Sequence, residues 1–206
     1  MANSQTDRFD SKVKYEYNVY LEVLNLKLGE ASLSVKDPGN IDGIDVYHLN
    51  FNVRTTKLGD SIYKIRNKID VWVNKETLNV VKQNKNISEL RKKKNSETMI
   101  RNQKGITNGK EFMVKETVFD PYSLILILSE FNIPNNQSKK FNIVDAGKSR
   151  VIEIKNLGTQ TIKTPYGNKQ GYTLSPVKNG QPVLKNKGDM EVLSLIHISE
   201  PTRRAI

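Results

Sequence analysis

Hydrophobic and polar residues alternate near the start of the chain. The apolar positions are Val13, Tyr15, Tyr17, Val19, Leu21 and Val23, and the residues between them are mostly polar. A period of two is typical of an extended strand with one face against a core and the other in water. After a break, a second alternating run covers residues 28–36. The pattern predicts an antiparallel, half-solvated β-sheet.

The same pattern predicts further strands over residues 45–56, 61–73, 78–82, 87–101 and 111–119. Turns are expected at residues 37–40, 57–60 and 105–109, where Gly, Pro, Asn or Asp interrupt the alternation. The 45–56 strand places Tyr47, Leu49, Phe51 and Val53 on one face. The 61–73 strand places Tyr63, Ile65, Ile69, Val71 and Val73 on one face, with Lys64, Arg66, Lys68 and Asp70 opposite.

One helix is predicted over residues 121–131. Asp120 suits the N-cap and Pro121 suits the first helical position. Apolar residues then recur at helical spacing, at Leu124, Ile127, Leu128 and Phe131. The apolar side is wide, so this helix should be largely buried.

Three more strands are predicted near residues 139–145, 149–164 and 169–177, and another begins at residue 188. Many short strands and one helix indicate an all-β fold, either an antiparallel β-barrel or a strongly curved half-barrel. The register of the strands should turn one apolar set inward. That set is Tyr15, Tyr17, Val19 and Leu21 beside Leu49, Phe51, Ile65 and Val71.

Composition narrows the possible chemistry. The chain has 206 residues, which suits one β domain, and no cysteine, which excludes disulfides and thiolate chemistry. No apolar run approaches the length of a membrane-spanning helix. The formal charge is +11, and residues 61–118 hold 14 basic and 6 acidic groups. Abundant Lys and Asn also fit an AT-rich genome, so charge alone does not indicate a ligand.

No motif in the chain indicates catalysis, and no metal or cofactor is expected. His48 is expected to be a surface residue on the polar face of its strand. Glu30 could pair with Asp120 or Glu130 as a hydrolase acid, but nothing in the sequence places them together. The Gly105-x-x-x-Gly109-Lys110 segment is one residue short of a phosphate loop and is interpreted as a turn.

Several short motifs resemble the DUF3108 family, a group of exported bacterial proteins of unknown function. In order they are Tyr15-x-Tyr17, Leu28-Gly29-Glu30-Ala31, Tyr47-His48-Leu49, Ile62-Tyr63, Lys75-Glu76-Thr77-Leu78, Phe119-Asp120-Pro121-Tyr122-Ser123-Leu124 and Thr164-Pro165-x-Gly167. The resemblance covers residues 12–192, which we interpret as a single domain. It implies a barrel-like antiparallel fold and a location in the periplasm or cell envelope, and it supplies no catalytic residues.

The two ends of the chain depart from that resemblance. No signal peptide is visible in residues 1–12, although family members begin with a leader. Members also close with a tryptophan-containing strand, a turn and a final strand. Here residues 193–206 instead resemble the translation of a sequencing-adapter read-through, so we expect them to be a non-native tail. The sequence leaves open whether the leader was a secretion or a lipoprotein signal.

Two candidate binding surfaces follow. A lipid-like or glycan ligand could contact aromatic side chains in the barrel interior, namely Tyr15, Tyr17, Tyr47, Phe51 and Tyr63. A polyanion of the envelope could face a set of basic side chains, namely Lys64, Arg66, Lys68, Arg91, Lys92 and Lys93. These basic residues could also form an ordinary solvated face or, less favourably, a nucleic-acid surface. A structural or interaction protein with a filled core is the alternative, and the oligomeric state is open.

Overall fold

The computed structural model describes residue 9 and residues 14–21, 26–164, 167–178, 181–182 and 192–195. Within these ranges it leaves aside the side chains of residues 17–21, 162–164, 178, 181–182 and 192–195. The chain divides into two compact units. The first comprises Met1–Leu124 and Asn142–Arg150, and the second comprises Ile125–Phe141 and Val151–Ile206.

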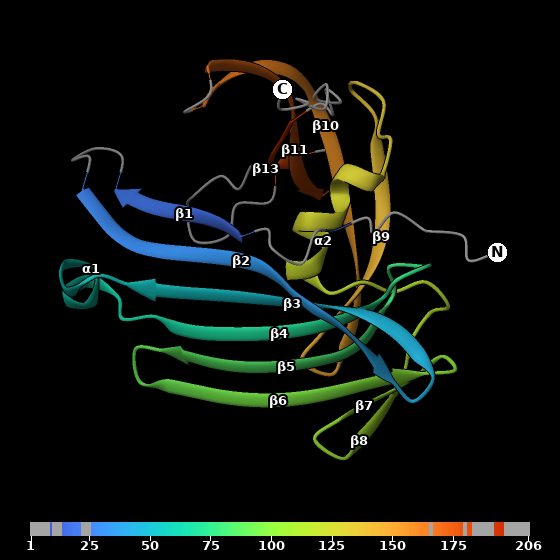
Figure 1. Ribbon diagram of the computed structural model, residues 1–206. Helices are drawn as coiled ribbons and strands as arrows, with labels where there is room; N and C mark the ends of the chain where they lie inside the picture. The colour runs from blue at the N-terminus through green and yellow to red at the C-terminus, as the bar shows by residue number, and fades with distance from the viewer. Residues whose placement is uncertain are drawn as a thin grey trace, which may run out of the picture. The chain divides into compact units, whose positions relative to one another are not determined.

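The first unit contains an eight-stranded antiparallel sheet in which every strand pairs with the next in sequence (Figure 1). The strands are β1 (Lys14–Leu21), β2 (Leu26–Ile41), β3 (Ile44–Thr55), β4 (Arg66–Asn74), β5 (Val80–Glu89), β6 (Lys92–Arg101), β7 (Lys104–Thr107) and β8 (Lys110–Met113). A short helix, α1 (Lys57–Ile62), links β3 to β4. The all-β, antiparallel class is thus confirmed.

The register of this sheet confirms the predicted inward face. Tyr15 lies opposite Leu33, Leu33 opposite Phe51, and Phe51 opposite Ile69, so one row crosses four strands. Partners in register point to the same side of a sheet. The buried apolar residues of β2 to β5 on this side are Leu33, Val35, Tyr47, Leu49, Ile69, Val71, Val73 and Val80.

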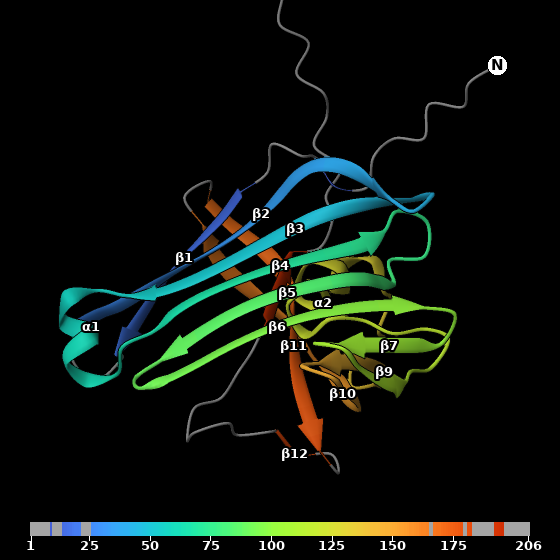
Figure 2. The ribbon, with the colours of Figure 1, turned by 90° about the horizontal axis from the view of Figure 1, so that it is seen from below.

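The described strands form a curved, open sheet, so the half-barrel form is confirmed rather than the closed barrel. β1 and β8 are the outer strands of its pairing order. The register shifts between Lys36 and Gly39 in β2 and between Trp72 and Val73 in β4. Such irregularities bend a strand and increase its twist. The bending of β2 and β3 is visible in Figure 1, and Figure 2 shows the sheet from below.

Several predicted boundaries are wrong. Residues 37–40 lie within β2, because the register shift accommodates the proline, and the chain turns instead at Asp42 and Gly43, both with positive φ. Residues 57–62 form α1 rather than a turn and the start of a strand. The predicted polar strand over 87–101 is the end of β5, a turn at Leu90 and Arg91, and β6.

The predicted helix and its cap are confirmed. Helix α2 (Pro121–Ile127) continues as the 3₁₀ turn η2 (Leu128–Glu130). Asp120 Oδ1 accepts hydrogen bonds from the backbone N–H of Tyr122 at 2.7 Å and of Ser123 at 3.1 Å. Of the apolar residues expected to be buried, Leu124, Ile127 and Leu128 are buried, and Phe131 is half-buried.

The second unit holds most of a smaller antiparallel sheet. Its strands are β9 (Ser138–Asp145), β10 (Lys148–Thr164), β11 (Gly167–Lys178), β12 (Gln181–Pro182) and β13 (Val192–Leu195), which confirms the three predicted strands over 139–177. β11 pairs with β10 along one edge, and with β12 and β13 along the other. The rest of the expected tail, residues 196–206, lies outside the described residues.

Candidate functional site

The aromatic side chains predicted to bind a ligand in the interior are mostly packed against other rings of the first unit. Tyr47 is buried, and its ring meets that of Phe9 edge-on with 5.1 Å between centroids. Phe51 is half-buried, and its ring centroid lies 5.0 Å from that of Tyr122. Tyr15 shares the row of Phe51 but is 42% exposed on the outer strand β1.

Tyr63 departs from the predicted interior set. It lies outside β4, directly after α1, and is 41% exposed. Its hydroxyl donates a 3.5 Å hydrogen bond to Glu89 Oε2. The side chain of Tyr17 lies outside the described residues. The described members of the predicted set therefore do not converge on one site.

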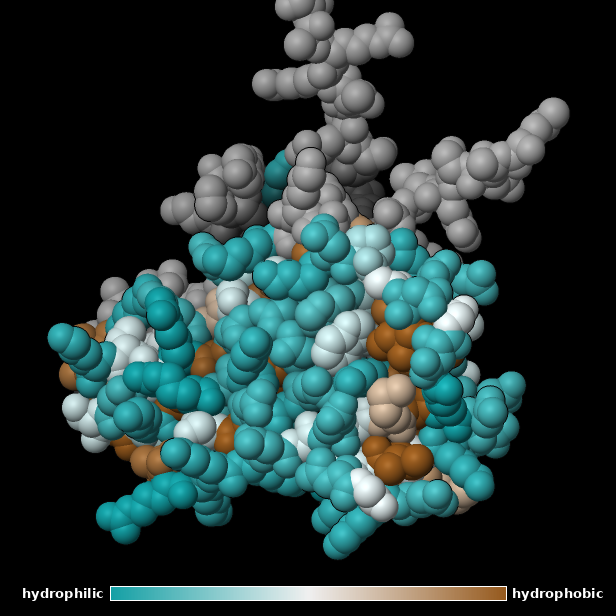
Figure 3. Space-filling view, turned by 60° about the horizontal axis from the view of Figure 1, so that its bottom comes forward, coloured by the Kyte–Doolittle hydropathy of each residue, from teal (hydrophilic) through white to brown (hydrophobic). Residues whose placement is uncertain are grey.

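The opposite face of the sheet is largely hydrophilic (Figure 3). His48 lies on this face, in register with Trp72. His48 is partly buried, with its Nε2 2.9 Å from Asp70 Oδ1, and its ring stacks on Trp72 at 4.4 Å. On the next strand, Lys82 Nζ lies 5.6 Å from the Trp72 ring centroid and 2.6 Å from Glu97 Oε1. Trp72 is therefore held between side chains of its own sheet and offers no free platform for stacking a nucleic-acid base.

A buried ionic cluster lies on the inward face of the first unit. Lys85 Nζ is 2.6 Å from Asp120 Oδ2 and 2.8 Å from Asp145 Oδ1, and it lies 5.1 Å from the ring centroid of Tyr122. Lys85 and Asp120 are buried, whereas Asp145 is partly exposed. Sequence reasoning missed Lys85, although it occupies an inward position of β5, opposite Ile69.

The electrostatics of this cluster keep Lys85 charged. Burial alone would lower the pKa of Lys85, but the carboxylates of Asp120 and Asp145 outweigh burial and raise that pKa above its ordinary value. Burial would raise the pKa of Asp145, but Lys85 holds it below its ordinary range. Complete burial raises the pKa of Asp120. A protonated, paired ammonium is not a nucleophile, so the cluster supports the fold rather than covalent chemistry.

The carboxylates considered as a hydrolase pair have separate partners. Lys27 Nζ lies 2.7 Å from Glu30 Oε1, and Arg54 donates hydrogen bonds of 3.0 and 2.7 Å to Glu30 Oε2. The hydrogen bonds from Lys27 and Arg54 lower the pKa of Glu30 from 4.5 to about 2. Glu30 is thus ionised and paired, and Asp120 is occupied by Lys85 and its helix cap.

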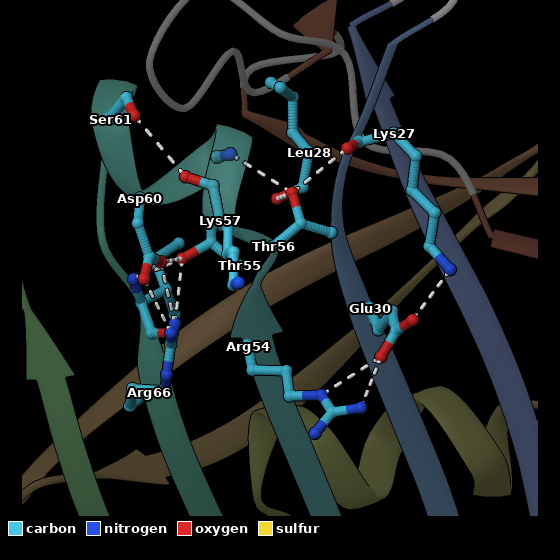
Figure 4. A network of polar contacts seen from close by, with 12 residues as sticks. Lys27, Leu28, Glu30, Arg54, Thr55, Thr56, Lys57, Asp60, Ser61 and Arg66 are labelled. Atoms are coloured by element: carbon cyan, nitrogen blue, oxygen red, sulfur yellow. Dashed lines mark hydrogen bonds and ion pairs between the residues drawn. The ribbon is translucent and has the colours of Figure 1, made fainter.

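Helix α1 is fixed to the sheet at the end where β2 begins and β3 ends (Figure 4). The backbone N–H of Thr56 donates to the carbonyl oxygen of Leu28 at 2.9 Å, and Thr56 Oγ1 caps α1 by accepting from Gly59 N at 3.1 Å. Gly59 approaches β2 so closely that a Cβ there would lie 2.0 Å from Leu28 O. The contacts with β2, rather than the helix propensity of six residues, determine α1.

A second set of contacts in Figure 4 ties α1 to the first residue of β4. Arg66 donates to both carboxylate oxygens of Asp60, at 2.9 and 2.7 Å, and to Thr55 Oγ1 at 3.0 Å. Thr55 Oγ1 also donates to Asp60. This bidentate pairing holds the α1 segment in a defined orientation.

The β5–β6 turn lies beside the start of β4. The backbone N–H of Leu90 donates to the carbonyl oxygen of Lys64 at 2.8 Å, and Ile65 forms an isolated bridge with Glu89. Lys64 is therefore adjacent to the turn that carries Arg91. This contact joins the two predicted groups of basic residues, which lie about 25 positions apart in the sequence.

We define the basic end of the first sheet by its exposed cationic side chains, Lys57, Lys64, Arg66, Lys68, Arg91, Lys92, Lys93 and Lys94. Arg66 pairs with Asp60, and Lys68 Nζ lies 3.9 Å from Asp70 Oδ2. Within the described part of the chain, the other six form no ion pair. Lys64 and Lys94 interact with Asp60 and Asp145 only at longer range, so the basic end carries an excess of positive charge.

Exposed apolar side chains lie among these cations. Leu58 and Ile62 are one helical turn apart in α1 and are 47% and 60% exposed. Tyr63 follows them, and Leu90 is 55% exposed at the β5–β6 turn. Figure 3 shows apolar residues among hydrophilic ones at the left end of this face, where α1 and the β5–β6 turn lie. Sequence reasoning missed this set, because Leu58 and Leu90 stand alone among polar neighbours.

Two further observations limit the chemistry. Among the described residues, no group of three or more His, Asp or Glu side chains is placed to hold a metal ion. In the same part of the chain, no helix is long and apolar enough to cross a membrane.

Comparison with known proteins identifies one related family. A family model described as "Protein of unknown function (DUF3108)" matches residues 16–200. No curated protein and no solved structure matches the chain.

Proposed function

The chain belongs to the DUF3108 family of proteins of unknown function, and from this premise we propose that it is a non-catalytic binding protein of the bacterial cell envelope. Its ligand is an anionic component of the envelope, and its binding surface is the basic end of the first sheet. We base the proposed location on the resemblance of the chain to a family of exported proteins. The non-catalytic role is supported by the engagement of Lys85, Asp120 and Glu30 in ion pairs.

One observation carries the proposal. The 2.8 Å hydrogen bond between Leu90 N and Lys64 O joins two basic segments that are separate in sequence. Around this contact, six of eight exposed cations form no ion pair with a described carboxylate. Clustered, unneutralised charge on a fixed backbone raises the local concentration of anions and accelerates their binding.

Two alternatives are less well supported. A ligand in the interior would need the aromatic rings that Tyr47 and Phe51 use for packing. A nucleic-acid surface would need several exposed aromatic platforms, but Trp72 is held between His48 and Lys82, and in the described part of the chain the basic end exposes a single ring, that of Tyr63.

Binding to the acidic polysaccharide alginate, with neutral dextran as the reference, tests the proposal. We expect the wild-type protein to bind alginate with an affinity that falls steeply as salt is added, since surface charges are screened. Substituting Lys64→Glu, Lys92→Glu and Lys93→Glu together should abolish most of the binding.

The matched control is Lys104→Glu, Lys110→Glu and Lys115→Glu together, three exposed lysines in β7, in β8 and just after β8. Under the proposal this control keeps most of the affinity for alginate. Equal losses in both variants would show that net charge alone drives binding, and no alginate binding by the wild type would contradict the proposal. A marked preference for single-stranded DNA would favour the nucleic-acid alternative.

A further inference from the structure

The basic end has two features, of which a binding site for a soluble polyanion needs only the first. It carries unpaired cations, and it exposes large apolar side chains, namely Leu58, Ile62, Tyr63 and Leu90. Water penalises exposed apolar surface, so side chains of this size are usually turned inward when packing allows. An apolar set surrounded by cations is typical of surfaces that lie on anionic lipid bilayers.

Leu90 supports this interpretation through its backbone. It adopts φ = +50°, in the left-handed region that favours Gly and Asn over leucine. A leucine at this turn position has a strained backbone and also exposes its side chain to water. The exposed side chain adds little packing to the fold, and backbone outliers of this kind cluster at functional sites.

The α1 segment holds its apolar residues in a fixed arrangement. The cap from Thr56, the close packing of Gly59 on Leu28 and the bidentate Arg66–Asp60 pair all restrain the helix. Leu58 and Ile62 therefore project from one side of an immobilised turn. A pre-organised surface loses little conformational entropy when it binds.

Charge complementarity indicates which kind of apolar partner fits. Lys57 and Lys64 flank the apolar residues of α1 along the chain, and Arg91 and Lys92 follow Leu90. Within the described residues none of these four cations is paired with a carboxylate. Lipid headgroups such as phosphatidylglycerol carry negative charge directly above an apolar layer, which matches both features.

We propose that the basic end of the first sheet docks on the surface of an anionic lipid membrane, with Leu58, Ile62 and Leu90 inserted among the lipids and the surrounding cations on the headgroups. This inference rests on the proposed function, because it assigns a partner to the same cations. The attachment is peripheral: α1 and the β5–β6 turn enter the interface, and the strands stay outside it.

Sedimentation with lipid vesicles tests the inference. The 206-residue protein is mixed with vesicles of phosphatidylcholine alone or of phosphatidylcholine with phosphatidylglycerol. We expect it to pellet with the anionic vesicles and to stay in solution with the neutral ones. Each lysine removed from the basic end should lower partitioning about fivefold, as expected for a charge near an anionic bilayer.

Variants of the apolar residues separate the inference from the proposed function. Leu58→Ser with Ile62→Ser, and separately Leu90→Asn, should each lower partitioning into anionic vesicles by about tenfold or more. Their binding to alginate should be unchanged, because the cations remain. The matched control is Ile106→Ser with Met113→Ser, two exposed apolar residues of β7 and β8, which should leave vesicle binding unchanged.

The vesicle and alginate measurements together distinguish membrane docking from polyanion binding. Normal vesicle binding by the α1 and Leu90 variants would overturn membrane docking and leave polyanion binding in place. Binding to alginate without binding to anionic vesicles would do the same. Equal binding to neutral and anionic vesicles would overturn the role of the cations in docking. A wild-type protein that binds neither anionic vesicles nor alginate would overturn both proposals. Circular dichroism on every variant confirms that the sheet is retained.

Discussion

The ammonium nitrogen of Lys85 lies 2.6 Å from Oδ2 of Asp120, and both side chains are buried. The same carboxylate caps helix α2 through its other oxygen, which accepts from the backbone of Tyr122 and Ser123. One side chain thus joins β5 of the first sheet to the start of a helix 35 residues later. Without Asp120, the buried ammonium of Lys85 would keep only the partly exposed Asp145 as a partner, which compensates its charge less well.

Asp120→Asn should therefore destabilise the protein strongly. The amide can still cap α2, but it cannot neutralise Lys85, so we expect the free energy of unfolding to fall by about 3 kcal/mol. Asp120→Ala should lose about a further 1 kcal/mol, because the cap is lost as well. Urea denaturation measures both. Asp145→Asn is the comparison: its side chain is partly exposed, so its cost should be clearly smaller. Equal stability of wild type and Asp120→Asn would show that the pair contributes nothing.

Gly59→Ala should disturb α1 without touching the sheet core. The added Cβ would lie 2.0 Å from the carbonyl oxygen of Leu28, which cannot move without breaking its hydrogen bond to Thr56. We expect a loss of about 2 kcal/mol in unfolding free energy, the usual cost of such overpacking. Gly39→Ala is the control, because the nearest atom to its Cβ is 3.9 Å away. The prediction fails if the two variants are equally stable.

Leu90→Asn should stabilise the protein. Asparagine tolerates positive φ better than leucine, and little packing is lost because Leu90 is largely exposed. The gain should be about 1 kcal/mol in chemical denaturation. A loss of stability would mean that the side chain packs against the protein, which would also remove its availability for a membrane.

Glu30 should titrate at an unusually low pH. Hydrogen bonds from Lys27 and Arg54 lower its pKa from 4.5 to about 2. Because the folded pKa lies below the unfolded one, this interaction stabilises the fold above pH 4.5 and is lost as the pH falls through 2. Carbon-detected NMR of the side-chain carboxyl measures the midpoint, and Arg54→Gln should move it upward. A wild-type midpoint near 4.5 would contradict the described contacts.

Much of the fold could be predicted because its strands are half-buried. The period-two pattern places Leu33, Phe51 and Ile69 on the buried face, and the register agrees. Asp120 with Pro121 is a local signal, since a cap needs only the next few residues. Asp42–Gly43 is also a hairpin signal, and the chain turns there rather than at the Pro-containing residues 37–40.

The missed features depend on distant contacts. Helix α1 depends on a contact with β2, in which the carbonyl oxygen of Leu28 accepts a hydrogen bond from Thr56. Nothing in the six residues of α1 indicates that partner. The β5–β6 turn contains neither Gly, Asn nor Pro, so it has no local signature. The sequence shows that Lys64 and residues 91–94 lie in basic segments. It does not show that these segments are neighbours, which follows from the hydrogen bond between Leu90 and Lys64.

Residues 142–150 belong to the first unit, although they follow a segment of the second unit in the chain. Gln83 donates a 2.9 Å hydrogen bond to the carbonyl oxygen of Val144, and Lys85 pairs with Asp145. Two buried polar side chains of β5 therefore have partners about 60 positions later in the chain. During synthesis the middle strands emerge first, and Lys85 then has no partner with which to leave water. We therefore expect Lys85 to keep the inner face of the sheet in contact with water until both of its partners, Asp120 and Asp145, have been made.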